Sequence, residues 1–356
     1  MSQRDQILEV LRGKREGAPL FLPDLTLWHK WHTSRHTRPN GESLAAAARD
    51  FGVPAWVQVK PWQTQYAGAR WTTEETGTER VVRFATGNGT LIARWTIGPD
   101  GDWWQTEYPV KTAGDLDLAL EVAKARVYVL VDNGLPEARR SVGTDGVVAL
   151  ELPMRPYSDV LHTLVGWGEG VALLMSEREV ADEIIAVLDE KLHELTAAAS
   201  ALPGDVLLAA DNLDGQYISP RTFRSYFADS YHRTTEIAQR HRRPLVVHVG
   251  GPARKLAPLL AETGVDAIQG IAGPPQGDAT LAEARVAAGP NVTLWGGIPQ
   301  DYLTPEWDET AFESALARAV ADVKADPRAV LGIADRAPIN LLPERLARVR
   351  EAIQSI

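Results

Sequence analysis

The sequence contains no cysteine among its 356 residues. A chain without cysteine forms no disulfide bond, no iron–sulfur cluster and no zinc site built on thiolates, and it has no cysteine nucleophile. Any metal ion bound here must therefore be held by histidine, aspartate, glutamate or asparagine side chains.

Long apolar runs, basic runs and targeting signals are also missing. No stretch approaches the roughly 18 apolar residues of a membrane-spanning helix, and the first residues, MSQRDQILEVLRGKREG, lack the apolar core of a signal peptide. The net charge of −10 disfavours nonspecific binding to nucleic acids or anionic membranes. We expect a cytoplasmic protein that acts on a small molecule, with neither nucleic acid nor membrane as a partner.

Strand and helix patterns alternate strictly through the second half of the chain. Eight segments have the apolar character of strands: 20–25, 55–59, 146–152, 205–211, 244–248, 265–270, 291–296 and 329–334. Strands that alternate with helices favour a parallel sheet, and eight such units predict an α/β fold of the (β/α)8 barrel type over residues 1–356. Neither a G-x-G-x-x-G nor a Walker sequence is present, which disfavours a Rossmann or P-loop fold.

Residues 79–110 interrupt this alternation. Two alternating runs, VVRFAT and TLIARWTI, are joined at Asn88-Gly89, a strong short-range signal for a hairpin. We predict an antiparallel β-hairpin insertion in a single barrel domain, as a surface decoration rather than a substrate lid. Nine of the eleven tryptophans precede residue 170, which indicates an aromatic pocket or an interface in the N-terminal half.

Polar residues stand at or just after the C-terminal ends of the predicted strands. They are Asp24, Glu151, Asp211, His248, Gln269 and Asp335. In a parallel barrel these ends meet at one mouth, where the chemistry of such enzymes takes place. A single aspartate there is often a helix N-cap, but several acids together with a histidine favour a site.

Two chemistries use this set of residues. In the first, His248, Asp335 and another carboxylate hold a divalent metal ion that polarises a leaving oxygen. In the second, an aspartate with a raised pKa and His248 transfer protons, while arginines such as Arg35 and Arg155 hold a substrate carboxylate.

Residues 28–38, WHKWHTSRHTR, concentrate aromatic, imidazole and guanidinium groups. We interpret this segment as a loop that covers the pocket, in which Trp28, His29 and Arg35 contact the substrate. A metal-binding pair of His29 and His32 is the weaker alternative.

Five segments share their order and spacing with one known superfamily. They are DNLDGQYISPRTFRSYF from Asp211, PLVVHVGG from Pro244, GPPQGDATLAEAR from Gly273, VTLWGGI from Val292 and VLGIADRAPINLLPERL from Val330. The chain thereby resembles the uroporphyrinogen decarboxylase superfamily, which includes methyltransferases that move methyl groups to and from corrinoids. The resemblance is strong over the last 200 residues and weak before residue 140. It implies a (β/α)8 barrel with its pocket at the C-terminal ends of the strands.

Two departures from the superfamily bear on substrate and metal. The arginine-rich RQAGRY segment by which true uroporphyrinogen decarboxylases bind propionates is replaced by DLTLWHKWHTSRH, so that substrate is not expected. Thiol-activating methyltransferases of the superfamily bind zinc through a His-x-Cys pair and a distant cysteine. Here His248 matches the histidine, Gly250 replaces the first cysteine, and Asp335 falls near the second. The resemblance therefore implies a harder site of His248, Asp335 and either Asp211 or Glu151, suited to an ether or phenolic oxygen.

Three functions stay open at this point. The favoured one is a corrinoid-linked methyltransferase that demethylates a small, for example methoxyaromatic, substrate, with zinc or another divalent metal ion and a corrinoid protein as partner. The second is a cofactor-free decarboxylase or lyase acting on a small carboxylate, with Asp211 and His248 in acid–base roles. The third is a ligand-binding barrel without catalysis. Because dimers are common in the superfamily, we also expect a homodimer.

Overall fold

The computed structural model describes residues 1–13, 15–99 and 101–356. The chain divides into two compact units, which are described separately. Unit 1 comprises Met1–Pro61, Asp132–Leu152 and Ala199–Ile356, and unit 2 comprises Trp62–Val131 and Pro153–Ala198.

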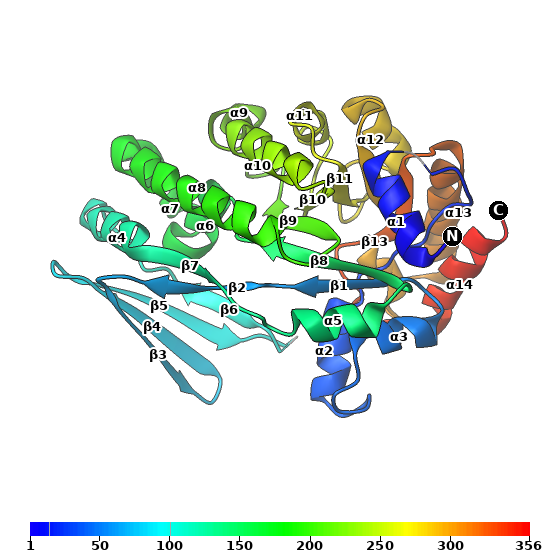
Figure 1. The fold of residues 1–356 in the computed structure, drawn as a ribbon, viewed down its shortest axis with the longest axis horizontal. Helices are drawn as coiled ribbons and strands as arrows, with labels where there is room; N and C mark the ends of the chain where they lie inside the picture. Colours follow the sequence, from blue (N-terminus) through cyan, green and yellow to red (C-terminus); the bar gives the residue numbers. More distant parts are fainter. Residues whose placement is uncertain (14, 100) are drawn as a thin grey trace. The chain divides into compact units, whose positions relative to one another are not determined.

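Unit 1 is built on a parallel seven-stranded sheet with the order β1-β8-β9-β10-β11-β12-β13 (Figure 1). The strands are β1 (Ala55–Val59), β8 (Gly146–Leu152), β9 (Val206–Leu213), β10 (Leu245–Val249), β11 (Ala267–Ile271), β12 (Thr293–Pro299) and β13 (Ala329–Ala334). Each strand pairs with the next strand of the unit along the chain, and every pair is parallel. This is the strand order of a (β/α)8 barrel, so the predicted fold class is confirmed.

The predicted strand 20–25 forms a single bridge rather than a full eighth strand. Phe21 makes an isolated parallel bridge with Leu331 of β13. The Leu22 N–H donates to the Leu331 carbonyl at 2.8 Å, and the Leu331 N–H donates to the Leu20 carbonyl at 2.9 Å. The segment thus continues the sheet beyond β13, but Pro23 lacks the N–H that a longer ladder would need.

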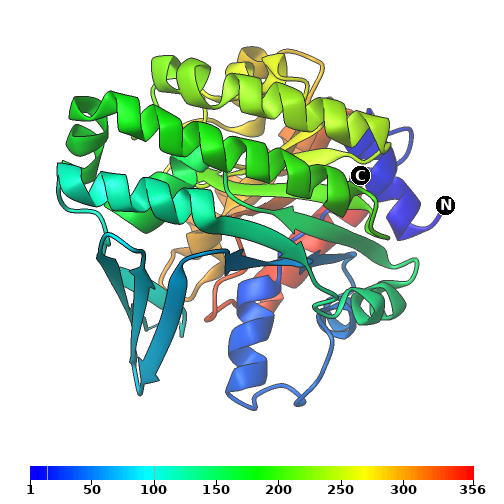
Figure 2. The same cartoon turned by 60° about the vertical axis from the view of Figure 1, so that its left-hand side comes forward.

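Helices connect and cover the strands of unit 1 (Figures 1 and 2). They are α1 (Gln3–Arg12), α2 (Thr26–Ser34), α3 (Leu44–Phe51), α5 (Leu135–Val142), α9 (Pro220–Tyr226), α10 (Ala228–Arg240), α11 (Ala257–Glu262), α12 (Leu281–Ala288), the 3-10 helix η2 (Gln300–Leu303), α13 (Glu309–Ala325) and α14 (Pro343–Gln354). Their starts follow from capping residues. Thr280 and Glu283 form a capping box on α12, and the Asp308 side chain accepts from the Ala311 N–H at the start of α13.

The interior of the sheet is apolar and is covered at one end by α1. Ile7 and Leu11 of α1 pack in one cluster with inward residues of the strands, among them Trp56 and Trp295. These two indoles meet edge to face, with ring centroids 4.7 Å apart, and both are almost fully buried. Gly332 of β13 makes room for Trp295, because a Cβ there would lie 2.3 Å from the indole Nε1. Since α1 covers the end at which the strands begin, the mouth of the barrel lies at their C-terminal ends.

Unit 2 contains the predicted insertion as part of a larger antiparallel sheet. Its strands are β3 (Arg70–Thr76), β4 (Glu79–Ala85), β5 (Thr90–Ile97) and β6 (Trp103–Glu107), in that order. The hairpin between β4 and β5 is confirmed, with Ala85 opposite Thr90, whereas β3 was not anticipated from the sequence.

The remaining elements of unit 2 are a strand pair and helices. They are β2 (Trp62–Tyr66) paired antiparallel with β7 (Arg126–Leu130), α4 (Ala113–Ala125), α6 (Pro156–Asp159), the π-helix η1 (Val160–Val165), α7 (Glu169–Ser176) and most of α8 (Arg178–Ser200). In the part of the chain that the structure describes, no helix has both the length and the apolar character needed to cross a membrane.

Candidate functional site at the barrel mouth

The inward positions of the strands change from apolar to polar toward the mouth. Four polar residues each stand two positions beyond a core residue of the same strand: Gln58 beyond Trp56, Glu151 beyond Ala149, His248 beyond Val246, and Gln269 beyond Ala267. Residues two apart on a strand point to the same face. The apolar interior is therefore followed by a polar layer at the end where (β/α)8 enzymes act.

Asp24 lies in this region and is held by three hydrogen bonds. The Thr26 N–H and hydroxyl donate to its Oδ1 at 2.9 and 2.6 Å, and the Gln58 Nε2 donates to its Oδ2 at 2.6 Å. The residue is only 3% exposed. Burial raises the pKa of Asp24, and the negative charge of Asp335 raises it further. The hydrogen bonds from Thr26 and the positive charge of Arg336 lower this pKa, but burial is the largest effect. The environment therefore favours the protonated carboxyl group.

His248 on β10 and Asp335 after β13 come close at the mouth, although these two strands are not neighbours in the sheet. The His248 Nε2 lies 3.8 Å from the Asp335 Oδ1, and the Arg336 Nε lies 3.4 Å from the same oxygen. Asp335 directly follows β13. Its backbone φ is +93°, which is unfavourable for any residue other than glycine. Such strained residues concentrate at functional sites. Two residues after Asp335, Ala337 donates its N–H to the Asp24 carbonyl at 2.7 Å, which ties this loop to Asp24.

Glu151 and Gln269 occupy the same polar layer. Burial raises the pKa of Glu151, and the positive charge of Lys60 opposes the rise. Gln269 is 2% exposed, and its Cα is paired with that of His248 across β10 and β11. The mouth thus contains two carboxyl groups with raised pKa values, Asp24 and Glu151, besides the His248–Asp335 pair.

A zinc site of the thiolate kind does not fit this mouth. A Cβ placed on Gly250 would lie 1.7 Å from the Asn212 Oδ1, so the Asn212 carboxamide occupies the space that a side chain at position 250 would need. Among residues 1–13, 15–99 and 101–356, the structure assembles no group of three or more histidine, aspartate or glutamate side chains able to hold a metal ion. His248 and Asp335 come together, but Glu151 does not complete a cluster with them.

Asp211 lies on the other face of β9, toward the helices. The Tyr231 hydroxyl of α10 donates to the Asp211 Oδ2 at 2.5 Å, and both residues are fully buried. The Tyr231 ring stacks with those of Phe223 and Phe227. This bond connects β9 to its covering helix, and the catalytic role expected for Asp211 stays a prediction.

The segment expected to be a covering loop is instead the helix α2 (Figure 2), and several of its side chains contact other residues of unit 1. Trp28 is buried edge to face against Phe51, at 4.9 Å between ring centroids. The His29 Nε2–H donates to the Glu42 carbonyl at 3.0 Å, and burial lowers the pKa of His29. The Arg35 guanidinium lies 4.4 Å from the centroid of the Trp31 ring. The substrate contacts expected for Trp28, His29 and Arg35 stay predictions.

The histidine pair of this segment also has structural partners. The His32 Nε2–H donates to the Ile339 carbonyl at 2.9 Å, and its Nδ1 lies 2.7 Å from the Thr37 hydroxyl. His32 therefore connects α2 to the loop that follows β13. Arg155, the other arginine expected to bind substrate, is fully buried in unit 2 directly before α6, and its role stays a prediction.

The sequence analysis missed Gln58 and Arg336, whereas Asn212 was expected at the mouth together with Asp214 as part of the run Asp211-Asn212-Leu213-Asp214. Gln58 was detectable in principle, because it stands two residues after Trp56 in a short strand pattern. Arg336 had no comparable signal, since it is placed by the irregular backbone after the end of β13.

Fold and mouth together define a (β/α)8-type barrel with a candidate active site at the C-terminal ends of its strands. The family model of uroporphyrinogen decarboxylase (URO-D) matches residues 162–356, more than half of the chain. The chain belongs to this family, as the sequence motifs predicted. A comparison with curated proteins gave no match.

One solved structure supports the same fold. A methyltransferase from Methanosarcina mazei aligns with a TM-score of 0.63 and 13% identity, over 100% of this chain and 99% of that chain. At this identity the likeness shows the fold alone. A D-psicose 3-epimerase from Clostridium cellulolyticum H10 aligns with a TM-score of 0.37 and 11% identity, over 62% of this chain and 81% of that chain. That score is too low to bear on function.

Proposed function

We propose that this protein is a methyltransferase that removes a methyl group from an oxygen atom of a small substrate, such as a methoxyaromatic compound, and passes it to a corrinoid carried by a partner protein. Membership of the URO-D family and the fold shared with a methyltransferase support an enzyme of this class. The observation that carries the proposal is Asp24, a buried carboxyl group with a raised pKa beside Asp335 and Arg336.

The chemistry explains why such a carboxyl group is useful. When the methyl group leaves, the carbon–oxygen bond breaks with its electron pair on oxygen, and the product oxygen needs a proton. A buried carboxyl group with a raised pKa holds its proton more tightly than a free aspartate does, and it can supply this proton to the leaving oxygen. His248 and Arg336, which both contact Asp335 and are more exposed than Asp24, orient the substrate in this proposal.

A divalent metal ion, zinc for example, stays an untested expectation. His248 and Asp335 would provide two of its ligands, and a bound ion would polarise the leaving oxygen. Because the described residues bring no third such ligand to this pair, no step of the proposal passes through a metal ion.

A second candidate function is decarboxylation of a small carboxylate. Arg336 at the mouth favours it, since a guanidinium group binds a carboxylate through paired hydrogen bonds. In this reaction the carbon–carbon bond breaks, carbon dioxide leaves, and Asp24 protonates the carbanion that remains.

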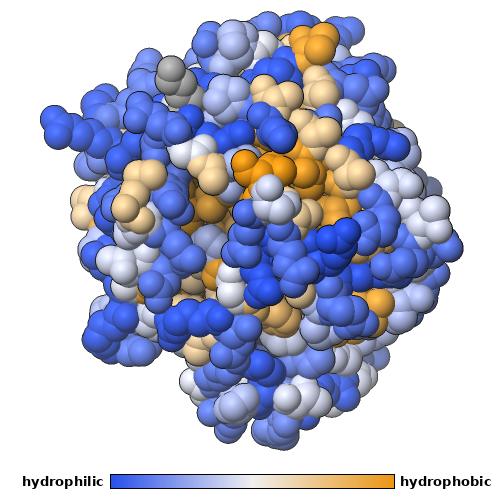
Figure 3. Space-filling view, turned by 90° about the vertical axis from the view of Figure 1, so that its right-hand side faces the viewer, coloured by the Kyte–Doolittle hydropathy of each residue, from blue (hydrophilic) through white to orange (hydrophobic). Residues whose placement is uncertain are grey.

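A corrinoid protein and a second copy of this chain are the partners we propose. On one side of the molecule, hydrophilic residues form most of the surface, and the largest group of hydrophobic residues lies near the centre of the view, with smaller groups around it (Figure 3). Hydrophobic areas of this kind are typical of interaction surfaces. Light scattering after size-exclusion chromatography tests the homodimer, and a monomeric mass at all protein concentrations would exclude it.

The experiment that separates the two reactions uses the wild-type protein with two substrate panels. Methoxyaromatic and other methylated compounds are supplied with chemically reduced cobalamin, and methylation is followed by the change in its absorbance. Small carboxylates are supplied without cobalamin, and released carbon dioxide is measured. Methylation of cobalamin supports the methyltransferase, and carbon dioxide release alone would replace it with the decarboxylase. Binding without either reaction would favour a non-catalytic barrel.

A further inference from the structure

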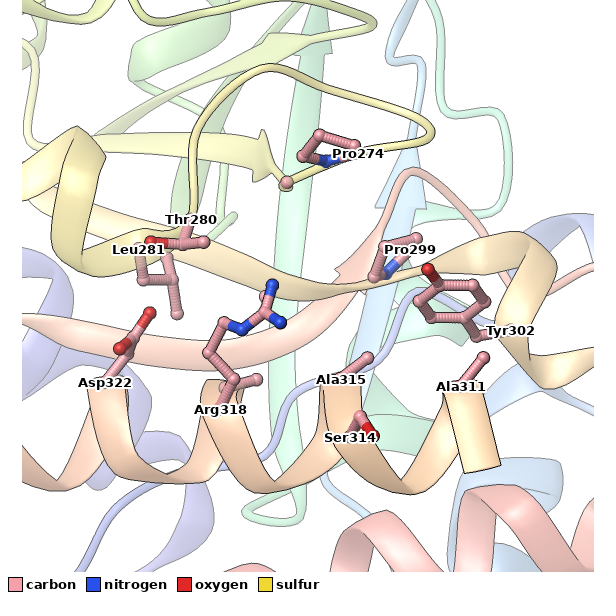
Figure 4. A pocket seen from close by; sticks show the side chains of 13 residues that line it. Pro274, Thr280, Leu281, Pro299, Tyr302, Ala311, Ser314, Ala315, Arg318 and Asp322 are labelled. Atoms are coloured by element: carbon pink, nitrogen blue, oxygen red, sulfur yellow. The ribbon is translucent and has the colours of Figure 1, made fainter. Parts of the chain in front are cut away.

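A cavity of about 150 Å³ lies in the helix layer of unit 1, between α12 and α13 (Figure 4). Its floor is one face of α13, and the loop after β11 that contains Pro274 forms its roof. The space exists because Ala315 and Ala319, one turn apart on α13, present only methyl groups to it. A cavity of this volume holds a ligand of about the size of benzene.

Two polar side chains point into this cavity. The guanidinium group of Arg318 extends from α13 into the space below Pro274, and the hydroxyl group of Tyr302 points inward from η2 (Figure 4). In the described part of the chain, Arg318 forms no hydrogen bond or ion pair with another residue. The Tyr302 ring is fixed edge to face against Trp307, at 4.7 Å between centroids.

Asp322, one turn along α13, does not neutralise Arg318. Its Oδ2 accepts from the Ala282 N–H at 3.1 Å, so the carboxylate is directed to the first turn of α12. Figure 4 shows it beside Leu281, away from the guanidinium group. Arg318 lies between Asp322, which is beside α12, and Tyr302 (Figure 4). One cationic and one anionic side chain thus line the cavity, an arrangement that favours a ligand with one anionic group over a polyanion.

We propose that this cavity is a binding site for a small oxyanion, a short carboxylate or a phosphate. Arg318 pairs with the anionic oxygens, Tyr302 donates a hydrogen bond, and the body of the ligand rests on Ala315 and Ala319. A guanidinium group with two parallel N–H donors suits both kinds of oxyanion. The site is separate from the barrel mouth and does not depend on the proposed reaction.

The roof of the cavity is also connected to the mouth. Gln276, in the roof loop, donates from its Nε2 to the Ala334 carbonyl at 2.5 Å and accepts from the Gln300 N–H at its Oε1 at 2.9 Å. Ala334 is the residue before the strained Asp335. One side chain thus joins the loop over the cavity to the loop that carries Asp335.

Thermal unfolding in the presence of benzoate or inorganic phosphate tests this site, at an ionic strength kept constant with chloride. The proteins are wild type, Arg318→Gln, Tyr302→Phe and the control Lys324→Gln, which removes one exposed charge from the same helix. We expect a saturable rise in Tm for wild type and Lys324→Gln. Arg318→Gln should bind about ten- to a hundredfold more weakly, because it loses a charge-assisted pair.

The two probes distinguish carboxylate from phosphate. A saturable effect of benzoate alone identifies a carboxylate site, and an effect of phosphate alone identifies a phosphate site. An equal rise in Tm for wild type and Arg318→Gln, or no saturable rise in wild type with either probe, would overturn the proposal.

Discussion

Asp24 shows how one residue's surroundings set its chemistry. A carboxylate that accepts three hydrogen bonds would ordinarily be stabilised in its charged form. Here burial at 3% exposure outweighs these bonds, and the pKa of Asp24 is raised. The same hydrogen bonds keep the group in place whether or not it is protonated.

The Asp24→Asn substitution tests this acid. It keeps the size of the side chain and removes the transferable proton, so turnover should fall by about 10²- to 10⁴-fold. Because the active form is protonated, wild-type activity should decline as pH rises through the raised pKa of Asp24, and the variant should lack this decline. Steady-state rates across the pH range measure both. If the activity of the variant still declined as pH rises, the decline would come from a group other than Asp24.

Asn212 and Gly250 form a pair that a double substitution can test. In Gly250→Ala the new methyl group would occupy the place of the Asn212 Oδ1, at 1.7 Å. We expect a loss of about 1–3 kcal/mol in the free energy of unfolding through overpacking. Adding Asn212→Gly should restore most of it, because the carboxamide is removed and glycine suits the φ of +49° at this position. Urea denaturation of the two single variants and the double variant measures the coupling between positions 212 and 250. If the two single effects on the free energy of unfolding simply add in the double variant, the proposed steric contact is wrong.

Asp266, directly before β11, makes the free energy of unfolding depend on pH. Its carboxylate accepts from the Leu245 N–H at 2.8 Å. Burial raises the pKa of Asp266 to about 6 from 3.8, although that bond, Arg328 and Arg12 oppose the rise. Since the folded state holds the proton more tightly, this residue's contribution to stability falls as pH rises from 3.8 to about 6 and is constant above that.

Asp266→Asn should therefore remove this part of the pH dependence. The amide oxygen can still accept from Leu245, and no charge is buried at neutral pH. We expect the variant to be more stable than wild type by about 1–3 kcal/mol above pH 6 and nearly equal at pH 4. Denaturant midpoints at both pH values test this, and a variant that is less stable at neutral pH would refute the assignment.

Among the elements, the parallel strands were the most predictable from sequence. The ends of β1 and β8 coincide with the predicted 55–59 and 146–152, because short apolar runs bounded by glycine and proline leave little choice. The segment 20–25 was overpredicted, since Pro23 limits its pairing. The pair β2 and β7 was missed because β7 directly follows α4 without a turn residue.

Which face a strand residue occupies could not be predicted in this fold. A strand of a parallel barrel is apolar on both faces, so the period of two that separates inside from outside is hidden. His248 proved to point into the barrel and Asp211 toward α10, although both stood at predicted strand ends. The partners of Asp24 were equally hidden, because Gln58 lies 34 residues away in the chain.

A substitution of Trp295 tests how the segment 20–22 is attached to β12. Its indole Nε1 donates to the Leu22 carbonyl at 2.9 Å, and the ring fills the barrel core. Trp295→Phe should cost about 2–4 kcal/mol, because it leaves a buried carbonyl unpaired and opens a cavity. The control Trp104→Phe, at a residue 59% exposed, should stay within about 0.5 kcal/mol of wild type. Similar losses in both variants in chemical denaturation would argue against a specific role for Trp295.

At the scale of the whole molecule, unit 1 contains all seven barrel strands and the mouth residues Asp24, His248 and Asp335. The sequence predicted the barrel because the strand–helix alternation and the family motifs agreed. The strand ends and the superfamily motifs both predicted that His248 and Asp335 meet, and the two side chains lie 3.8 Å apart. The proposed methyl transfer requires a substrate and a corrinoid partner outside this chain, which strand patterns do not describe.

The most direct test of the account is the rate of methyl transfer from a methoxy substrate in His248→Ala and His241→Ala. His248 faces the mouth, whereas His241 lies exposed at the end of α10. The account predicts that His248→Ala loses about 10²- to 10⁴-fold in rate with its melting transition retained, while His241→Ala equals wild type. A wild-type rate in His248→Ala would show that the chemistry does not take place at this mouth.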